Sequence, residues 1–526
     1  MCGIAVAIGW DDARLSVQRL IAGMLHRGDV TDPLVEIGGK IALCTRRLRI
    51  VDPEGGAQPQ ASFDGRFLVS FNGEIYNHAA LRRELESCGI SFRTECDTEV
   101  VANVIRVWGA NGIKRLDGMF AFVAVDVSTG NFIAARDPFG VKPLYFVQTP
   151  GGYLFCSEIR PLLSATESGD VLFLPPGYFL TRGFHGSYDN VVPRPAAIAS
   201  AQELDRRLSA AVHARMPEDL PVASLFSGGI DSTLVAHYAR QFCPTMCGYI
   251  AVGHDAPDRD YARRYADATG FDLREVPIDL DSAATLGLIE TVVGTVEAFE
   301  PAVIRPSLYS YIVSEHIHQD GFRVALCGEG ADELFAGYEP LELAFAQADG
   351  IGRSVREQCL GMMHRANLQR VDRCAMRFEL EIREPFLDRS IAGYAKGLGS
   401  EALVEQSGGM PVGKAPLRAL YDQHPSQLPA FIRDREKKLF HEGAGADEGG
   451  WLSLFEDAIS DSEFCDGQRA FADFAIASKE ELFLLRALAR DMDVKRVPHL
   501  RRRLCLNMPR TAPPGRAGNA HAVARA

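Results

Sequence analysis

A short run of glycine and hydroxyl residues lies near the middle of the chain, between an apolar segment and an amphipathic one. It reads Ser-Gly-Gly-Ile-Asp-Ser over residues 227–232. The apolar residues at 222–226 predict a buried strand, and the spacing of Leu234 and Tyr238 predicts a helix that begins near Ile230. A strand, a tight loop and a helix N-terminus offer free backbone N–H groups to an anion, and glycine lets the backbone approach it closely. The run therefore predicts a phosphate-binding loop.

The type of phosphate site follows from what comes after the glycines. No Gly-Lys-Ser or Gly-Lys-Thr follows them, so the run is not a P-loop. The full string resembles the PP-loop of the ATP pyrophosphatases, a motif of adenylating synthetases and amidotransferases. That resemblance implies a site that holds pyrophosphate as a leaving group while a carboxylate is adenylated. The alternative is an ordinary strand-to-helix turn.

A cysteine stands at the second position of the chain. If Met1 is removed, Cys2 carries both a thiol and a free α-amine. The ordinary pKa of such an amine is about 7.7–8.0, so it can act as the general base that produces the thiolate. The alternative is a tail residue without a role, and the motifs downstream decide between the two.

Five motifs follow Cys2 in order. They are His-Arg-Gly at 26–28, Arg-Arg-Leu-Arg-Ile-Val-Asp at 46–52, Asn-Gly-Glu-Ile-Tyr-Asn at 72–77, Asp-Thr-Glu at 97–99 and Arg-Asp-Pro-Phe-Gly at 136–140. Together with Cys-Gly-Ile-Ala at 2–5, they resemble the class II (N-terminal nucleophile) glutamine amidotransferase domain. One departure is Asp29-Val30, because that family usually has Pro-Asp after His-Arg-Gly.

The functional groups of glutamine require different partners. Arg47 is the candidate for the α-carboxylate, because a guanidinium can donate two parallel hydrogen bonds to it. Glu74 and Asp97 have the charge that suits the ammonium, and Asn72 with the Gly73 N–H would form the oxyanion hole. The resemblance implies the same roles. It adds backbone contacts to glutamine from Leu48, Arg49, Ile50 and Val51.

Two further strand ends in the second half carry residues suited to a nucleotide. Val252-Gly253 ends one predicted strand, where an apolar side chain and bare backbone suit an adenine. Cys-Gly-Glu-Gly-Ala-Asp-Glu at 327–333 ends another. Its glycines permit close approach of a ligand, and its three acids are the hard oxygen donors that Mg²⁺ prefers. The alternative for these acids is a solvated helix cap.

These strand ends, the Ser-Gly-Gly loop, the extension Leu-Phe-Ala-Gly-Tyr at 334–338 and Arg-Glu-Pro-Phe-Leu-Asp at 383–388 resemble the synthetase domain of glutamine-hydrolysing asparagine synthetases. With the first half, the resemblance extends to about residue 490. It implies ATP and Mg²⁺ as cofactors, and a reaction in which aspartate is converted to β-aspartyl-AMP and then to asparagine. Ammonia would come from glutamine hydrolysed at Cys2 and reach the anhydride unprotonated through an enclosed passage between the domains.

The resemblance also assigns residues to the synthetase site. Asp231 and Asp332 would hold Mg²⁺ and pyrophosphate, Glu329 would lie beside the acyl-adenylate, and Lys437 would reach the ATP phosphates. Contacts to the adenylate and its phosphates would come from Phe226, Ser227, Gly228, Gly229, Asp231, Ser232, Val252, Cys327 and Gly328.

The acceptor pocket departs from the family pattern. Ala302 and Val303 stand where the family usually has two threonines, whereas Arg305, a candidate partner for the acceptor carboxylate, is kept. The loss of two hydroxyls leaves another carboxylate of specialised metabolism open as the acceptor. A third alternative is a non-catalytic binding protein on the same scaffold, which would have no need of Cys2 or Asp231.

Composition bounds the remaining classes. The 526 residues are 47% hydrophobic and 24% charged, as in globular enzymes, and their net charge of −13 argues against a nucleic-acid surface. No apolar run approaches the ~18 residues of a membrane span, and the first residues lack the basic start of a signal peptide. The twelve scattered cysteines indicate reduced thiols. We expect a cytoplasmic enzyme of small-molecule substrates (glutamine, ATP, and aspartate or another carboxylate), with no nucleic-acid or membrane partner, and a homodimer is possible.

The elements that must position these residues fall into two halves. In the first, strands are expected at 4–8, 40–48, 67–71, 119–127, 132–136 and 144–147. One helix is expected from Asn77 to Cys88, and a second, capped by Asp97 or Thr98, through Val101, Val104 and Val107. Many strands with two helices predict a layered α+β domain, and the resemblance implies the αββα fold of N-terminal nucleophile enzymes.

In the second half, strands and helices alternate. Strands are expected at 222–226, 246–252, 273–278 and 324–327, and helices at 202–215, from 230, and at 259–269, 286–298 and 308–316. This order predicts a doubly wound parallel α/β sheet with the nucleotide at the carboxyl ends of its strands. We expect a glutaminase domain at 1–190, a synthetase domain at 203–500 and a disordered tail at 501–526, which is rich in Arg, Pro, Gly and Ala.

Overall fold

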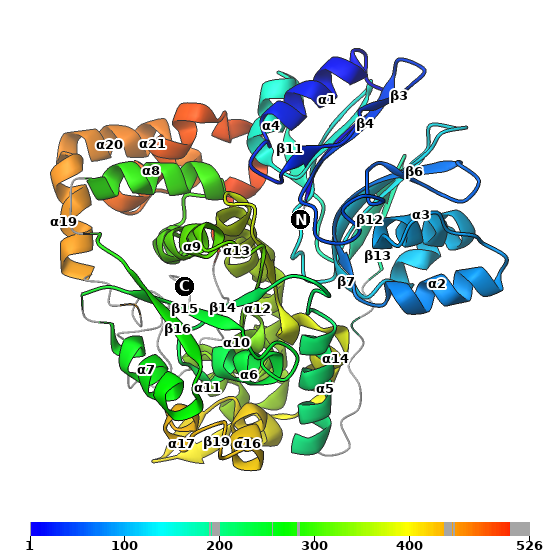
Figure 1. The fold of residues 1–526 in the computed structure, drawn as a ribbon. Coiled ribbons are helices and arrows are strands. Elements are labelled where there is room, and N and C mark those ends of the chain that lie inside the picture. Colours follow the sequence, from blue (N-terminus) through cyan, green and yellow to red (C-terminus); the bar gives the residue numbers. More distant parts are fainter. Residues whose placement is uncertain are drawn as a thin grey trace. The chain divides into compact units, whose positions relative to one another are not determined.

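The structure is a computed structural model, and it describes residues 2–188, 191, 200–254, 256–280, 284–435, 444 and 448–504. Lys437 and residues 505–526 of the expected tail lie outside this part of the chain. The chain divides into two compact units (Figure 1). The first comprises Met1–Asn190, Met376–Glu379 and Leu488–Arg502, and the second comprises Val191–Ala375, Leu380–Ala487 and Arg503–Ala526. Residues 376–379 and 488–502 group with the first unit, although they lie in the later part of the sequence.

The first unit contains two mostly antiparallel sheets. One has the order β11-β9-β10-β1-β4-β2, with β3 also paired to β4, and the other has the order β13-β12-β8-β7-β6-β5. The strands of the first sheet are β1 (Cys2–Ile8), β2 (Val30–Thr31), β3 (Val35–Ile37), β4 (Ile41–Arg47), β9 (Tyr145–Thr149), β10 (Gly152–Cys156) and β11 (Val171–Phe173). Those of the second are β5 (Gln60–Ala61), β6 (Phe67–Ile75), β7 (Gly118–Asp126), β8 (Phe132–Arg136), β12 (Tyr178–Thr181) and β13 (Phe184–Ser187).

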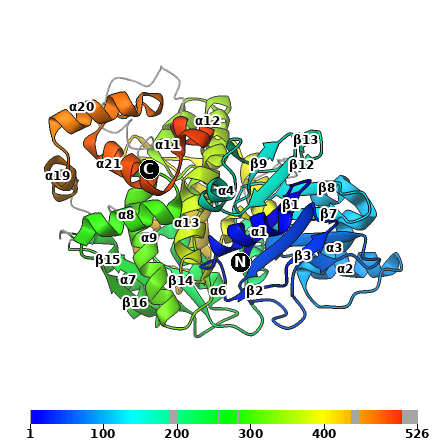
Figure 2. The same ribbon diagram turned by 90° about the horizontal axis from the view of Figure 1, so that it is seen from above.

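Alternation along β7 shows how the layers of this unit are held together. Ala121, Val123 and Val125 pack in one apolar cluster with Ile4 and Val6 of β1, between the two sheets. The intervening side chains of β7 pack in a second cluster with residues of two helices, α2 (His78–Ser87) and α3 (Asp97–Trp108). Both faces of β7 are therefore buried, which suits its almost continuous apolar sequence. Figures 1 and 2 show α2 and α3 over this sheet, and the αββα layering agrees with the prediction.

The expected strands of the first half are present, with two differences. Strand β6 continues to Ile75, so Asn72, Gly73 and Glu74 lie within a strand and not after one. The prediction of only two helices was wrong, because α1 (Ala13–Ala22), α4 (Ile159–Ala165) and the 3₁₀ segment η1 (Gly109–Arg115) are also present. The apolar residues of α1 recur with a helical period, so this helix had a detectable signal.

The second unit is built on a parallel sheet with the order β16-β15-β14-β17-β18. Its strands are β14 (Val222–Leu225), β15 (Cys247–Val252), β16 (Asp272–Pro277), β17 (Val324–Leu326) and β18 (Glu381–Arg383), and a separate hairpin is formed by β19 (Glu405–Ser407) and β20 (Met410–Val412). The predicted parallel sheet is confirmed, and β18 extends it by one strand beyond those expected. Because β14 and β17 are neighbours, the loops that follow them emerge side by side.

Helices surround this sheet. They are α5 (Ala201–His213), α6 (Ile230–Ala239), α7 (Pro257–Thr269), α8 (Ala284–Val296), α9 (Pro301–Gln319), α10 (Ala331–Leu334), α11 (Glu339–Gln347), α12 (Asp349–Met362), α13 (Asn367–Met376), α14 (Arg389–Gly397), α15 (Ser400–Leu403), α16 (Ala415–Gln423), α17 (Ala430–Arg433), α19 (Glu448–Ala458), α20 (Asp461–Ala470) and α21 (Lys479–Asp491). The short 3₁₀ segments of this unit are η2 (Met363–Arg365), η3 (Pro385–Leu387) and η4 (Ala472–Phe474), whereas η5 (Val494–Arg496) and η6 (Pro498–Arg501) belong to the first unit. Helix α9 begins earlier than expected, so 302–305 belong to its first turns. Among the described helices, none has both the length and the apolar character needed to cross a bilayer.

Candidate active sites

Cys2 is the first residue of β1, and its backbone nitrogen and its backbone carbonyl are both hydrogen-bonded. Its backbone nitrogen donates to Asn72 Oδ1 at 2.8 Å, and its carbonyl accepts from Nε of the fully buried Arg27 at 3.2 Å. This nitrogen becomes the α-amine when Met1 is removed. Arg27 is held in turn, because its Nη1 donates to Glu158 Oε1 at 3.1 Å. The predicted nucleophile and the predicted oxyanion-hole residue Asn72 therefore meet, although one begins the chain and the other lies in the second sheet.

Gly73 has a backbone conformation that a side chain would prevent. Its φ is +150°, and a Cβ at this position would lie 2.0 Å from the carbonyl oxygen of Met119 on the paired strand. Any other residue would have to push β6 and β7 apart. The pairing of β6 with β7 next to Asn72 thus depends on glycine at this position.

Asp97 is the first residue of α3, and its side chain contacts the end of β6. Its Oδ2 accepts from the backbone N–H of Ile75 at 2.9 Å, and burial raises the pKa of its carboxyl, partly offset by that hydrogen bond. Glu74, the other candidate for the ammonium of glutamine, is also buried. The prediction that Asp97 or Thr98 caps this helix was one residue late, because the N-cap is Cys96.

Arg47, the candidate clamp for the glutamine carboxylate, is held by a carboxylate of the chain itself. Its Nε donates to Asp32 Oδ1 and Oδ2 at 3.2 and 3.1 Å, and its Nη1 donates to the Pro53 carbonyl at 3.3 Å. Asp32 also accepts from the Gln58 N–H at 2.9 Å. Burial raises the pKa of Asp32, and Gln58 and Arg47 oppose that rise. Sequence reasoning missed Asp32. Its signal was an acid directly after β2, where its N–H donates to the Thr45 carbonyl of β4.

The segment after Arg47 is held by Asp29 and Val30, the two residues that depart from the family motif. Asp29 accepts from the backbone N–H of Arg49 at 3.2 Å and from its Nε and Nη2 at 3.0 and 2.9 Å. Val30 pairs with Arg47 in the ladder between β2 and β4. Asp29-Val30 therefore fixes the start of the predicted glutamine-binding segment, which comprises Leu48, Arg49, Ile50 and Val51.

In the second unit, the Ser-Gly-Gly loop follows β14, and hydrogen bonds join its two ends. The Ser227 N–H donates to Ser232 Oγ at 3.2 Å, and the two serine hydroxyls lie 3.2 Å apart. A Cβ added at Gly328 would lie 2.8 Å from Cβ of Asp231, so the loop after β17 packs directly against the loop after β14. The adjacency of the two strands thus brings the predicted nucleotide and metal residues to one place.

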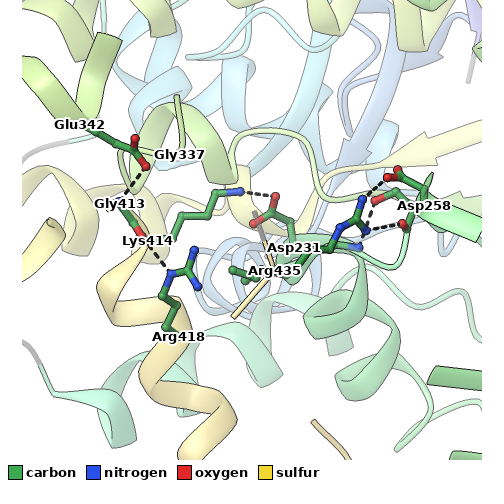
Figure 3. A pocket seen from close by; sticks show the side chains of 11 residues that line it. Asp231, Asp258, Gly337, Glu342, Gly413, Lys414, Arg418 and Arg435 are labelled. Carbon is green, nitrogen blue, oxygen red and sulfur yellow. Dashed lines mark hydrogen bonds and ion pairs between the residues drawn. The ribbon is translucent and has the colours of Figure 1, made fainter. Parts of the chain in front are cut away.

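A pocket opens at this place (Figure 3). It is lined by Ser227, Gly229, Ile230, Asp231, Asp258, Gly337, Glu342, Gly413, Lys414, Arg418 and Arg435. Lys414 Nζ lies 2.5 Å from Asp231 Oδ2 and 2.6 Å from Asp332 Oδ1. Sequence reasoning missed Lys414, because nothing near it in the chain indicates that it meets a loop 183 residues away.

Two arginines of the pocket are tethered by other groups. Arg435 donates to the Ser227 carbonyl at 3.0 Å and pairs with Asp258, and Arg418 Nε donates to the Gly413 carbonyl at 3.3 Å. The pocket therefore combines three cationic side chains with the backbone of the Ser-Gly-Gly loop. That combination suits a polyphosphate.

Glu329 lies in a buried polar cluster with residues of α13. Arg370 Nη2 donates to its Oε1 at 2.5 Å, and Asn367 Nδ2 donates to its Oε2 at 3.0 Å. The Asn367 amide also donates to Glu333 Oε1 at 3.1 Å, which accepts from Tyr338 Oη at 2.9 Å. Burial, followed by the charges of Asp332 and Glu329, raises the pKa of Glu333 to about 8. Sequence reasoning missed Asn367 and Arg370.

The residues expected beside the adenine differ in their surroundings. Phe226 is buried and packs on Phe271, with ring centroids 4.9 Å apart. Cys327 is also buried, its N–H donates to the Arg383 carbonyl at 3.1 Å, and burial holds the pKa of its thiol well above the ordinary value. Val252 ends β15, next to the strand that carries the Ser-Gly-Gly loop.

Comparison with known proteins gives matches over both halves of the chain. Residues 1–172 match the model of the glutamine amidotransferase domain, and residues 203–358 and 346–492 match that of asparagine synthase. Asparagine synthetase [glutamine-hydrolyzing] 2 of Lotus japonicus is 31% identical over 481 residues, which are 87% of this chain and 80% of that protein. Asparagine synthetase [glutamine-hydrolyzing] 1 of Arabidopsis thaliana matches with the same identity and the same coverage.

The chain belongs to the glutamine-hydrolysing asparagine synthetase family. The predicted enzyme class and the succession of a glutamine amidotransferase domain and a synthetase domain are thereby confirmed. Among solved structures, glutamine phosphoribosylpyrophosphate amidotransferase from B. subtilis matches 62% of this chain and 81% of its own at 18% identity, with a TM-score of 0.31. That TM-score is too low to add to the description of the fold.

Within this asparagine synthetase-family chain, Arg305 has a partner in the second unit. Its Nε and Nη2 donate to Glu480 Oε1 and Oε2 at 2.9 and 2.6 Å, and Trp451 Nε1 donates to Glu480 at 2.8 Å. Ala302 and Val303, which replace the usual threonines, are buried in the same turns of α9. An acceptor carboxylate at Arg305 would have to share or replace Glu480.

The donor set around Asp231 and Asp332 fits a divalent cation. Two carboxylates converge there on a buried ammonium, so a positive charge between them is already stabilised. No group of three or more His, Cys, Asp or Glu side chains able to hold a metal occurs among the described residues. A Mg²⁺ ion held by these two acids would take its remaining oxygen ligands from phosphate and water.

Proposed function

We propose that this protein makes asparagine from aspartate, with ammonia from glutamine and with ATP cleaved to AMP and pyrophosphate. The observation that carries the proposal is the meeting of Asp231 and Asp332 at the Ser-Gly-Gly loop, in a chain whose family is established by both halves. Two carboxylates at a phosphate-binding loop suit the departure of pyrophosphate with a divalent ion.

In the first unit, Cys2 is the proposed nucleophile. Its α-amine, freed by removal of Met1, takes the thiol proton, and the thiolate attacks the side-chain amide carbon of glutamine. Asn72 and the Gly73 N–H stabilise the oxyanion, the α-ammonium gives its proton to the departing nitrogen, and the breaking C–N bond releases ammonia. Water then hydrolyses the thioester to glutamate. The contact between the Cys2 nitrogen and Asn72 Oδ1 supports this pairing of roles.

Arg47 is the proposed partner of the glutamine carboxylate, with Glu74 and Asp97 on the ammonium. The Asp32 carboxylate engages the Nε of Arg47, which fixes the plane of the guanidinium. Backbone of Leu48, Arg49, Ile50 and Val51 would complete the contacts to glutamine.

In the second unit, the Ser-Gly-Gly loop is the proposed cradle for the ATP phosphates. Backbone and side chains of Ser227, Gly228, Gly229 and Ser232 would contact phosphate oxygens, and Phe226, Val252, Cys327 and Gly328 would enclose the adenosine. Asp231 and Asp332 would hold Mg²⁺, which supplies charge neutralisation of the pyrophosphate leaving group when bound. We also keep Lys437 as a proposed phosphate ligand, although it lies outside the described residues.

Glu329 is the proposed group beside the acyl-adenylate. Ammonia forms the new C–N bond at the activated carbonyl carbon, the bond from that carbon to the AMP oxygen breaks, and the added nitrogen must lose a proton. The Glu329 carboxylate would accept that proton, and its hydrogen bonds from Arg370 and Asn367, which orient it, support this role.

The acceptor is tested by following pyrophosphate from the purified full-length protein with ATP, Mg²⁺ and glutamine. We expect release that depends on aspartate, with equimolar asparagine. Release with another carboxylic acid but not with aspartate would contradict aspartate as the acceptor and leave the adenylating activity standing. Arg305 as the acceptor partner, a homodimer and a cytoplasmic location stay predictions of the sequence.

A further inference from the structure

Lys414 occupies the position between the two proposed metal ligands. Figure 3 shows its side chain extending into the pocket and ending at Asp231. Its ammonium lies 2.5 Å from Asp231 Oδ2 and 2.6 Å from Asp332 Oδ1, and all three residues are at most 9% exposed. This ammonium therefore provides positive charge where two buried carboxylates converge.

The backbone of Lys414 is fixed, and its long side chain reaches from there into the pocket. Its N–H donates to the Phe335 carbonyl at 2.8 Å, just before α16 begins. A Cβ on the preceding Gly413 would lie 1.7 Å from the Ala336 carbonyl oxygen, so only glycine permits this close approach. Beyond Cα, four methylene groups carry the ammonium into the pocket.

The other cations of this pocket are held by the protein. Arg435 is engaged by Asp258 and the Ser227 carbonyl, and Arg418 by the Gly413 carbonyl. Lys414 is the cation whose partners are the proposed metal ligands themselves. Binding of a divalent ion to Asp231 and Asp332 therefore requires a new partner for the Lys414 ammonium, and phosphate oxygens of ATP are suitable acceptors.

We propose that Lys414 is a resident counter-cation that makes metal binding depend on nucleotide. It neutralises Asp231 and Asp332 while the pocket is empty, and it transfers to the phosphates when ATP enters, so the divalent ion binds with ATP and not before it. This inference rests on the proposed function, because it takes the two acids as metal ligands. No group of three or more His, Cys, Asp or Glu side chains able to hold a metal occurs in the described part of the chain, so phosphate oxygens must also complete the coordination of the ion.

The test measures the affinity for Mn²⁺ by electron paramagnetic resonance on the full chain, with and without α,β-methylene-ATP. In the wild type, we expect the protein to bind Mn²⁺ at least ten times more tightly with the nucleotide analogue than without it. Mn²⁺ bound to the free analogue is subtracted in this comparison. In Lys414→Met, nucleotide-free Mn²⁺ affinity should rise at least tenfold, because the carboxylates have lost their competing cation. Lys396→Met is the matched control, since Lys396 is also largely buried but pairs with Glu357 away from the pocket.

Two results would overturn the inference in distinguishable ways. If the wild type binds Mn²⁺ equally well without the analogue, or if Lys414→Met leaves nucleotide-free affinity unchanged, the counter-cation role fails while the metal site stands. If Asp231→Asn does not weaken Mn²⁺ binding with the analogue, the metal ligands themselves are misassigned and both proposals fail. The wild-type comparison needs no variant, so it decides the order of binding even if Lys414→Met does not fold.

Discussion

Two arginines two residues apart pair with acids in different surroundings, and the difference separates their roles. Arg47 and its partner Asp32 have side chains only 8% and 3% exposed, whereas the side chain of Arg49 beside Asp29 is 47% exposed. Losing one member of a buried pair leaves an uncompensated charge, but an exposed pair contributes little. Loss of the Asp32 carboxylate should therefore disturb the orientation of Arg47 toward glutamine, whereas loss of the Asp29 carboxylate should have a much smaller effect.

We expect Asp32→Asn to raise the KM for glutamine about tenfold or more, equivalent to about 1.4 kcal/mol of binding free energy. The amide keeps the shape of the side chain but removes the charge that holds Nε of Arg47. Ammonia-dependent synthesis should stay within a factor of two, which separates the effect from general unfolding. Steady-state kinetics with both nitrogen donors make the measurement, and Asp29→Asn is the matched control. Equal effects of the two variants would contradict the assignment.

Asn367 bridges the two carboxylates nearest the proposed amination step. Because its amide donates to both Glu329 and Glu333, Asn367→Ala should release Glu329 while leaving the Ser-Gly-Gly loop intact. A hydrogen bond to a charged group is worth about 1.5–3 kcal/mol, so ammonia-dependent amide formation should fall about tenfold or more. ATP–pyrophosphate exchange in the presence of aspartate should be retained.

The control for this variant lies on the same helix. Gln369→Ala also removes a buried side-chain hydrogen bond of α13, to the Val296 carbonyl, but it does not touch Glu329. Parallel losses of exchange and amide formation in Asn367→Ala, or equal losses in both variants, would mean that Asn367 only supports the fold.

At the scale of elements, helices α5 and α6 and the end of α16 pack around His237, a histidine whose pKa is lowered. Burial, then the neighbouring His424 and Arg240, lowers the pKa of His237 to about 4, and Asp205 opposes this shift. His424 is paired with Asp205 at 2.7 Å, and the rings of His237 and His424 lie 5.0 Å apart. These three elements therefore pack around a neutral imidazole.

The sign of the pH effect follows from the unfolded state, in which the pKa of His237 returns to about 6.5. The unfolded chain then binds the proton first, so stability is present above pH 6.5 and is lost as the pH falls toward 4. Between pH 7 and 5 the loss should be about 2 kcal/mol of unfolding free energy. Urea unfolding of wild type and His237→Asn measures it, and the variant should lack this part of the pH dependence. An identical pH dependence in both proteins would contradict the neutral imidazole.

The elements were predictable from the sequence where their period and their motifs were local. Strands β1, β7, β14 and β15 have apolar runs or alternation, and the strand-to-helix order identified the parallel sheet. Two features lacked a local signal: Lys414 follows a short hairpin, and Asn367 and Arg370 begin a helix that the sequence analysis did not assign. Both sites depend on contacts over tens to hundreds of residues, which no window of sequence contains.

At the scale of the molecule, each unit holds one complete set of proposed groups for one half-reaction. Cys2, Asn72 and Arg47 all lie in the first unit, and Asp231, Glu329, Asp332 and Lys414 all lie in the second. The two chemistries therefore share no side chain. Ammonia is the species that links them, and ammonia added to the solution can replace it.

Cys2→Ala should abolish glutamine-dependent synthesis and leave ammonia-dependent synthesis within about a factor of two, because the barrier of the second half-reaction does not involve the thiol. Asparagine formation from each nitrogen donor, at saturating ATP and aspartate, makes the measurement. Alanine fills the same buried position with little loss of packing, so the hydrogen bond from the Cys2 nitrogen to Asn72 can persist. The reciprocal variant, Asp332→Asn, should retain glutamine hydrolysis and lose synthesis from either donor. If Cys2→Ala lost both activities while remaining folded, the thiol would be needed for synthesis itself, and the division of chemistry between the two units would be wrong.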